Sequence, residues 1–229
     1  MRALIDADTP VFGSAVSCEG EEEWKATSRL DTTIEKIIDA CGCSSYTLFV
    51  SGEGNFRYDI DPLYKSHRGP SPEHREACRK HLVKYWKAVE CHGYEADDAV
   101  GCEQNDDTFI VGIDKDLLMI PGKHYRWPII RGGRREVRAE QWHDISEEDG
   151  IRTFFEQSLI GDKADNIIGV NGIGPVKAKR ALEHCTTEEE MYTVCKDMYM
   201  DDERYKKNLD LLWIWRSYGY TYSILRECK

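Results

Sequence analysis

The stretch Ser158–Leu182 reads SLIGDKADNIIGVNGIGPVKAKRAL, and it decides the fold and function that we predict for the chain. Its two carboxylates, Asp162 and Asp165, supply the oxygen ligands that a hard metal ion takes. The glycine-rich turn over 169–174 follows, and glycine tolerates the positive φ and close approach that let backbone N–H groups meet a phosphate. The stretch therefore predicts a metal site beside a phosphate-binding turn.

A short basic helix is expected after this turn. Pro175 suits a first helical turn, where its missing N–H is tolerated. The helix then presents Lys177, Lys179 and Arg180. Metal ligands, a phosphate-binding turn and basic side chains together suggest an enzyme that acts on nucleic acid.

The bulk composition is that of a soluble globular protein of one α/β domain, or of a core with a small appendage. The chain has 229 residues, of which 41% are hydrophobic and 32% are charged. It has no apolar run of membrane-spanning length, and its N-terminus enters a strand-like run without the features of a signal peptide. Its nine cysteines are odd in number and form no CxxC pair, so we expect reduced thiols in a cytoplasmic protein.

The net charge of −11 argues at first against nucleic acid, whose partners usually carry a basic face. An acidic metal site can dominate this sum, however, and the basic residues are partly segregated from the acids. The most basic region is 64–90, which includes Lys65, Arg68, Arg75, Arg79, Lys80, Lys84 and Lys87. A solvated helix face is the alternative interpretation of this region.

Hydrophobic patterning predicts alternating strands and helices, which favours a parallel sheet. The expected strands are Arg2–Asp6, Tyr46–Val50, Thr108–Ile113, Tyr125–Ile130 and Glu136–Arg138, the last two around a Gly132-Gly133 turn. The expected helices are Thr33–Ala40, Glu73–Val89, one beginning at Glu95–Val100, Ile151–Ile160, Glu188–Met200 and Glu203–Trp215. Pro10, Gly13 and the acidic run Glu19–Glu23 predict a loop or an irregular start.

Acidic residues follow several of these strands, at the sheet edge where ligands gather. Asp6 ends the first strand with Asp8 two residues on, and Asp114 and Asp116 follow the third. Taken singly, such acids have a structural explanation, since Asp97 or Asp98 can cap a helix, as can Asp162 and Asp165. Taken together they would repel one another, so they favour bound cations. Two Mg²⁺ or Mn²⁺ ions about 4 Å apart would neutralise them and clamp a phosphodiester for attack by water.

The ordered motifs resemble those of the 5′-nuclease family, which includes the 5′→3′ exonuclease domain of bacterial DNA polymerase I, the flap endonucleases and the bacteriophage 5′-exonucleases. They are Leu4-Ile5-Asp6, Tyr64-Lys65-Ser66-His67-Arg68, Glu95-Ala96-Asp97-Asp98, Asp114-Lys115-Asp116-Leu117-Leu118 and Gly161-Asp162-Lys163-Ala164-Asp165-Asn166. The resemblance covers roughly 2–182, and the short chain looks most like a free-standing phage exonuclease.

The resemblance implies a fold and a role for each matching residue. The fold would be a PIN-like α/β nuclease core over 1–157, with an abbreviated basic arch at 64–90, and a helical part over 158–229 with a helix-three-turn-helix. One metal ion would be held by Asp6, Glu95, Asp97 and Asp114 with Asp98 supporting, and a second by Asp116, Asp162 and Asp165. Lys65 and Arg68 would contact the scissile phosphate, and duplex DNA would meet Gly169, Gly172, Gly174, Lys177, Lys179, Arg75 and Arg79. The turn is also a candidate site for K⁺.

The chain departs from the family pattern at one expected ligand. The family usually has a further Asp after the second strand, where this chain has Ser51-Gly52-Glu53-Gly54. Either Glu53 substitutes for it or the ligand is absent. The short span before Glu95 also blurs the distinction between an exonuclease and a flap endonuclease.

We therefore expect a monomeric metal-dependent 5′→3′ exonuclease or flap endonuclease acting on duplex, nicked or 5′-flapped DNA. An RNase H-like activity on RNA–DNA hybrids is a further hypothesis. Two alternatives stay open. One is a structure-specific DNA-binding protein with crippled catalysis, because of the missing Asp. The other is a PIN-type ribonuclease, against which the duplex-binding turn at 169–174 speaks.

Overall fold

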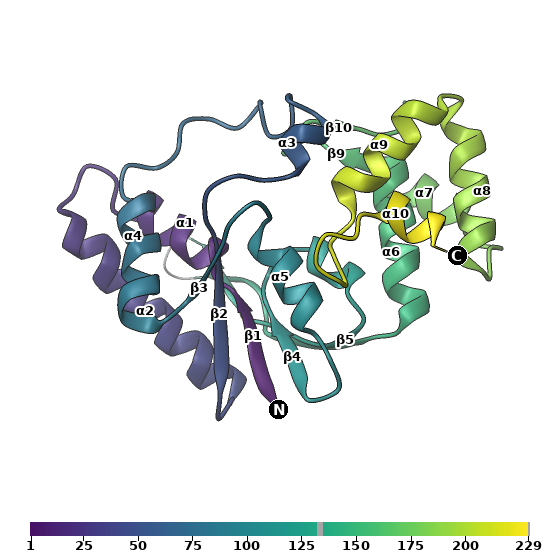
Figure 1. Ribbon diagram of the computed structural model, residues 1–229. Coiled ribbons are helices and arrows are strands. Elements are labelled where there is room, and N and C mark those ends of the chain that lie inside the picture. The colour runs from purple at the N-terminus through teal and green to yellow at the C-terminus, as the bar shows by residue number, and fades with distance from the viewer. Residues whose placement is uncertain (132–134, 229) are drawn as a thin grey trace.

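The computed structural model describes residues 1–131 and 135–228, and the side chains of 129–131 and 135–138 are not described. Its centre is a six-stranded sheet in the order β3-β2-β1-β4-β5-β8 (Figure 1). Neighbouring strands run parallel except for the antiparallel pair β5 and β8. The strands are β1 (Arg2–Asp6), β2 (Tyr46–Ser51), β3 (Val89–Cys91), β4 (Thr108–Val111), β5 (Gly122–Arg126) and β8 (Gln141–Ile145). The expected mainly parallel sheet is confirmed.

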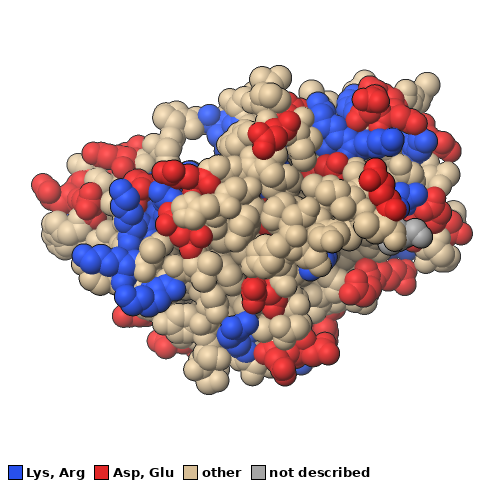
Figure 2. All heavy atoms as spheres, in the orientation of Figure 1, with Lys and Arg blue, Asp and Glu red and all other residues tan. Residues whose placement is uncertain are grey.

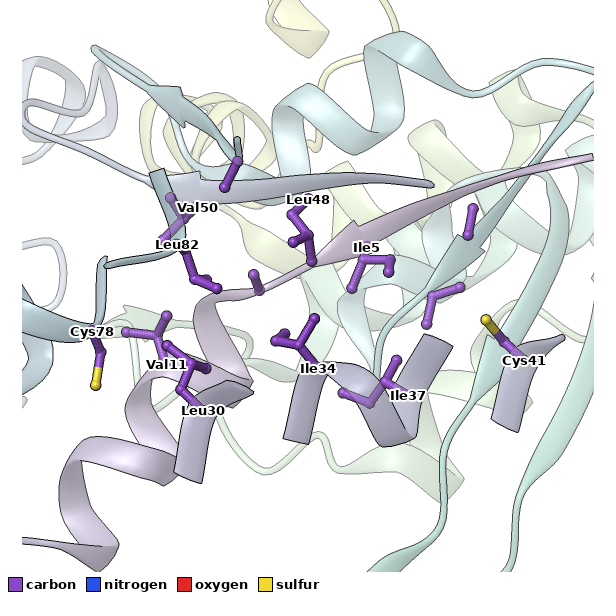
Figure 3. Packing of buried hydrophobic residues seen from close by; sticks show 14 of the residues in the cluster. Ile5, Val11, Leu30, Ile34, Ile37, Cys41, Leu48, Val50, Cys78 and Leu82 are labelled. Carbon is purple, nitrogen blue, oxygen red and sulfur yellow. The ribbon is translucent and has the colours of Figure 1, made fainter. Parts of the chain in front are cut away.

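Helices cover both faces of this sheet. On one face lie α1 (Asp8–Ser17), α2 (Glu23–Cys41) and α4 (Arg75–His81), the last continued by a π-helical turn at Leu82–Trp86. Figure 3 shows Ile5, Leu48 and Val50 of the strands pointing at Leu30, Ile34 and Ile37 of α2. Leu4, Phe49 and Ile110 point to the opposite face, where α5 (Ala96–Glu103) packs. Side chains alternate between the two faces along each strand, so the sheet contributes to two separate cores.

The C-terminal helices form a third core beside the sheet (Figure 1). They are α6 (Glu147–Ile160), α7 (Pro175–Ala181), α8 (Glu188–Tyr199), α9 (Asp202–Leu212) and α10 (Tyr222–Glu227). Between α6 and α7 lie the short strands β9 (Gly161–Asp162) and β10 (Ile167–Ile168). This order gives the helix, glycine-rich turn and helix that were expected, and α6 runs across the boundary expected at 157/158.

The connections complete the chain. The short helix α3 (Arg57–Ile60) and a 3₁₀ turn (Asp116–Met119) follow the second and fourth strands, and β6 (Ile129–Arg131) pairs with β7 (Arg135–Arg138). The Gly132-Gly133 turn lies outside the described residues. All nine cysteines are free thiols, as expected. Within 1–131 and 135–228, no helix is both long and apolar enough to cross a membrane.

Three local predictions were wrong. Asp8–Ser17 is a helix rather than a loop, because Pro10 falls in its first turn, where proline is tolerated. The helix expected over Glu73–Val89 stops before β3, with Lys87 in the left-handed conformation. Trp213 and Trp215 lie beyond α9, where each is less than 10% exposed.

A buried ion pair between α3 and α5 also contacts the chain at the end of α9. Arg57 and Asp98 are 2% and 0% exposed, and two hydrogen bonds of 2.6 and 2.9 Å connect the guanidinium to the carboxylate. Arg57 also donates to the carbonyl oxygens of Leu211 and Trp213 at 2.8 and 2.9 Å. The backbone N–H of Trp215 donates to Asp98 at 3.1 Å. The pair therefore holds α3, α5 and the end of α9 together.

Replacing one partner of this pair should destabilise the fold severely. We expect Arg57→Ala to lower the free energy of unfolding by about 3–5 kcal/mol, because it leaves the Asp98 carboxylate buried without its cation. Urea denaturation followed by circular dichroism measures this change. Lys25→Ala, which removes an exposed ion pair with Glu21, is the control and should leave the midpoint almost unchanged. Equal midpoints for both variants would contradict the role given to Arg57.

Candidate active site

A cleft of about 880 Å³ opens at the carboxyl end of the parallel strands. The acids that line it are Asp6, Asp8, Glu95, Asp97 and Asp114. The basic residues that line it are Lys65, Arg68 and Arg75, and the aromatic residues are Phe12 and Tyr58. No His or Cys is among the described residues that line the cleft. This donor set is that of a hard, oxygen-preferring cation rather than of zinc.

The fold explains why these acids meet. Asp6 is the last residue of β1, and Asp8 begins α1 directly after it. Glu95 and Asp97 stand at the N-terminal end of α5, where the helix dipole favours negative charge. Asp114 follows the neighbouring strand β4. Because these strands are parallel, their ends bring acids from distant parts of the chain to one edge.

Burial and mutual repulsion make the acids costly to ionise together. Asp6 is 7% exposed, and burial and then the charge of Asp8 raise its pKa to about 8. Burial, Asp98 and Glu95 raise the pKa of Asp97 well above its ordinary range. Burial also raises the pKa of Asp8, against the hydrogen bonds from Ser51. A cation at this edge would relieve these shifts.

The pKa of Glu95 is lowered rather than raised, because basic side chains surround its carboxylate. Its carboxylate pairs with the Lys65 ammonium, and it accepts a hydrogen bond of 2.8 Å from the Tyr64 hydroxyl. Although burial raises its pKa, Lys65 and Arg57 lower it to about 2. Lys65 therefore stands beside an acid of the cleft, where an entering phosphate would compete for it.

A second group of acids lies beside the cleft and contains Asp116, Asp162 and Asp165. The Lys115 ammonium bridges Asp116 and Asp162 at 3.0 and 3.1 Å. Burial, followed by the charge of Asp114, raises the pKa of Asp116 to about 6. Asp165 pairs with Arg68 and accepts from the Tyr64 hydroxyl at 3.0 Å. Across the described parts of the chain, no three His, Cys, Asp or Glu side chains are arranged closely enough to hold a metal ion as they stand. A cation held by the second group would compete with the lysine and arginine side chains that pair with these carboxylates.

Besides the second group of acids, two further sequence-predicted ligands, Asp98 and Glu53, do not line the cleft. Asp98 is fully buried, and both its oxygens are engaged by Arg57, so it supports the fold rather than a metal ion. Glu53 is exposed and is not among the cleft residues, although its neighbours Gly52 and Gly54 are. The substitution of Glu53 for the expected Asp is therefore not supported.

Sequence reasoning missed Asp8 and the supporting role of Tyr64. Asp8 lines the cleft and accepts hydrogen bonds from the backbone N–H of Ser51, at 3.0 Å, and from its hydroxyl. The signal for Asp8 is its spacing of two residues from Asp6, at the end of the first strand. Because a loop was expected around Pro10 and Gly13, the start of α1 at Asp8 was not predicted.

The connection between α3 and α4, residues 61–74, runs past the cleft, and we call it the strap (Figure 1). Its first part is fastened to the β9–β10 region. The backbone N–H of Lys65 donates to the Asp165 carbonyl at 3.0 Å, and the Asn166 amide donates to the Leu63 carbonyl at 2.9 Å. This is the region expected as an abbreviated arch, with Arg75 at the start of α4. Arg79, which was expected to meet duplex DNA, forms ion pairs with Glu76 and Glu90.

The glycine-rich turn presents an open surface near α7. Gly172 has φ +74°, and a Cβ at Gly172 or Gly174 would meet nothing within 4 Å. At Gly169 a Cβ would come within 2.4 Å of the Ile160 backbone, so this glycine is needed for packing. Lys177 donates to the Gly172 carbonyl at 2.8 Å, and Lys179, two residues further along α7, is also exposed. Figure 2 shows Lys and Arg side chains gathered over α4 and over α9 on one face of the molecule.

The chain is similar in sequence to known exonucleases and polymerases, although no family model matches it. It is 29% identical over 176 residues to a 5′-3′ exonuclease of Halalkalibacterium halodurans, which covers 70% of this chain and 57% of that protein. It is 31% identical over 158 residues to DNA polymerase I of Streptococcus pneumoniae, with 61% of this chain and 18% of that protein covered. The chain therefore spans about half of the first relative and a small part of the second.

The fold is similar to those of solved 5′-nucleases. T5 5′-exonuclease with bound divalent metal ions (zinc) matches with a TM-score of 0.62 at 16% identity, over 93% of this chain and 89% of that one. The catalytic core of Rad2 in complex with DNA substrate matches with a TM-score of 0.53 at 14% identity, over 80% and 60% of the two chains. The resemblance expected from the ordered motifs is confirmed, as is the α/β fold with a mainly parallel sheet flanked by helices.

The raised pKa of Asp6 predicts how stability depends on pH when EDTA removes divalent cations. The folded state holds the Asp6 proton up to about pH 8, while the unfolded state releases it near 3.8, so stability should fall as pH rises toward 8. The buried His124, with its pKa lowered to about 4, opposes this trend only up to about its ordinary value of 6.5. We therefore expect Asp6→Asn to flatten the decline between pH 6.5 and 8.

Urea unfolding at a series of pH values measures this effect. Glu53→Gln, which changes an exposed acid outside the cleft, should retain the slope of the unaltered protein. Parallel curves for Asp6→Asn and the unaltered protein would show that Asp6 is not protonated in the fold.

Proposed function

We propose that the chain is a structure-specific 5′-nuclease that hydrolyses phosphodiester bonds of DNA with the aid of divalent cations, Mg²⁺ or Mn²⁺. The observation that carries this proposal is the cleft in which five carboxylates from separate segments meet Lys65 and Arg68. The similarity in sequence to a 5′-3′ exonuclease supports it. The activity, the substrates and the number of ions are parts of the proposal.

The residues of the cleft suit hard cations. Asp6 is nine-tenths buried, and the ion pairs formed at the cleft by the described side chains involve Glu95 and Asp165 rather than Asp6 or Asp97. In the proposal, Asp6, Glu95, Asp97 and Asp114 hold one ion, and Asp116, Asp162 and Asp165 hold a second. When bound, two such ions activate water and neutralise the charge that develops on the phosphate.

The chain's own residues bind and orient the substrate. Lys65 and Arg68, on the strap, exchange their carboxylate partners for the oxygens of the scissile phosphate. Lys65 is 15% exposed, so its charge acts on the phosphate with little screening by water. Water adds to phosphorus and gives up a proton, the P–O bond to the leaving part of the strand breaks, and the leaving oxygen takes up a proton, so that one water is consumed for each bond cut.

The glycine-rich turn and α7 suit the duplex part of the substrate. Backbone groups of Gly172 and Gly174 and the side chains of Lys177 and Lys179 would contact phosphates without reading sequence. Arg75, in the wall of the cleft, would guide the strand to be cut. The exposed aromatic rings of Phe12 and Tyr58 in the same wall could stack on bases.

Cleavage of 5′-labelled substrates tests this function. We expect Mg²⁺-dependent products from duplex, nicked or 5′-flapped DNA, and no products in EDTA. Asp114→Asn should lower the rate more than about 100-fold, since loss even of a residue behind a ligand costs 10–100-fold. Glu53→Gln should retain the rate.

The other outcomes distinguish the alternatives. Binding to flapped DNA without cleavage in Mg²⁺ or Mn²⁺ would favour a DNA-binding protein. Cleavage of single-stranded RNA in preference to duplex DNA would favour a PIN-type ribonuclease. RNA–DNA hybrids test an RNase H-like activity.

Lys65 should act on turnover rather than on affinity. We expect Lys65→Ala to lower kcat about 100- to 1,000-fold, as for the loss of one preorganised group that stabilises developing charge, while Kd for flapped DNA changes little. Single-turnover kinetics and a binding assay in Ca²⁺ separate the two quantities. Lys177→Ala is the matched control, because its loss should weaken binding and not the chemical step. An equal loss of binding and rate in Lys65→Ala would make it a mere anchor.

A further inference from the structure

Asp8 connects three elements at the centre of the cleft. Its carboxylate accepts from the backbone N–H of Ser51, at 3.0 Å, and from the Ser51 hydroxyl, at the end of β2. The same hydroxyl accepts from the backbone N–H of Ala96, at 3.0 Å, at the start of α5. The backbone N–H of Asp8 itself donates to Asp6 at 3.0 Å. Asp8 is thus fixed between β1, β2 and α5, with its carboxylate at the edge where the other acids meet.

A role in capping does not explain this carboxylate. α1 has no side-chain capping hydrogen bond, and Asp8 directs its oxygens across the sheet to β2 instead. A neutral side chain such as Asn could accept the same hydrogen bond from the Ser51 backbone. The negative charge is therefore unnecessary for the tie between α1 and β2.

The charge of Asp8 is also not neutralised by the protein. Asp6 lies two residues away with its own buried carboxylate, and the ion pairs formed at the cleft by the described side chains involve Glu95 and Asp165 rather than Asp8. Arg75 lines the cleft and attracts Asp8 without a direct ion pair. Two neighbouring carboxylates in a partly buried cleft are stable when a cation joins them.

The segment 51–54, which the structure describes, brings no carboxylate of its own into the cleft at the end of β2. Ser51 has a neutral side chain, and Glu53 is exposed outside the cleft. We propose that Asp8 is a carboxylate ligand of the divalent-cation site, and that Ser51 is the residue that positions it. This inference rests on the proposed function, and it assigns the acid that the sequence lacks after β2 to the start of α1.

Direct measurement of Mn²⁺ binding to the purified protein tests this assignment without substrate. Free Mn²⁺ is followed by electron paramagnetic resonance, and unfolding temperatures are measured in EDTA. We expect Asp8→Asn to weaken the binding of one Mn²⁺ at least about 10-fold, by comparison with the 10–100-fold effect of residues behind a ligand. In EDTA the variant should unfold at the same or a higher temperature, because a repulsive charge is gone. A merely structural role would instead lower the unfolding temperature and leave Mn²⁺ affinity unchanged, which would overturn the proposal.

Two further variants sharpen the test. Glu53→Gln should leave Mn²⁺ binding unchanged, because its side chain lies outside the cleft. Asp8→Asn combined with Ser51→Asp moves the carboxylate to the other side of the same contact, and it should recover affinity relative to Asp8→Asn alone. Loss in Glu53→Gln with none in Asp8→Asn would assign the ligand to Glu53 and overturn the proposal.

Asp97→Asn separates this inference from the function on which it rests. If Asp97→Asn loses Mn²⁺ affinity and Asp8→Asn does not, the role of Asp8 is overturned and the nuclease function stands. If the unaltered protein binds no Mn²⁺, both are overturned.

Discussion

The bidentate contact between Arg57 and Asp98 is the interaction on which the cleft depends. Asp98 belongs to the same helical turn as Glu95 and Asp97, so the position of α5 decides where those acids point. Arg57 in turn connects this turn to the carbonyl groups of Leu211 and Trp213 at the end of α9. Because both charges are buried, neither can lose its partner without a large penalty. The C-terminal segment therefore helps to place the carboxylates at the N-terminal end of α5.

The acids themselves act against folding. Burial raises the pKa of Asp6, Asp8 and Asp97, which means that the folded chain resists their ionisation. The protein offsets part of this cost with Lys65 on Glu95 and with Lys115 between Asp116 and Asp162. In the proposed function, metal ions and phosphate would take the place of these ion-pair partners. The contacts that stabilise the edge of the sheet would then have to be given up when the substrate binds.

The sheet and most of the site could be predicted from the sequence because each depends on local pattern. Alternating apolar strands and helices predicted the parallel topology, and the resemblance to the 5′-nuclease family implied that Asp6, Glu95, Asp97 and Asp114 share one site. The failures came from contacts that sequence spacing does not carry. In the sequence nothing distinguishes Asp98 from its neighbour Asp97. Its contact with Arg57, forty-one positions away, is what holds its carboxylate outside the cleft. Asp8 was not predicted as a residue of the site, because its contact with Ser51 depends on how β1 and β2 align.

The fastening of the strap to the β9–β10 region has a mechanical consequence. Lys65 shares a backbone hydrogen bond with the very residue, Asp165, whose side chain completes the second acidic group, and Asn166 holds Leu63 next to it. Hydrogen bonds therefore tie the beginning of the strap directly to these acids. In the proposed nuclease, a DNA strand that displaced the strap would also disturb Asp165, so entry of the DNA and the geometry of the second acidic group would be coupled.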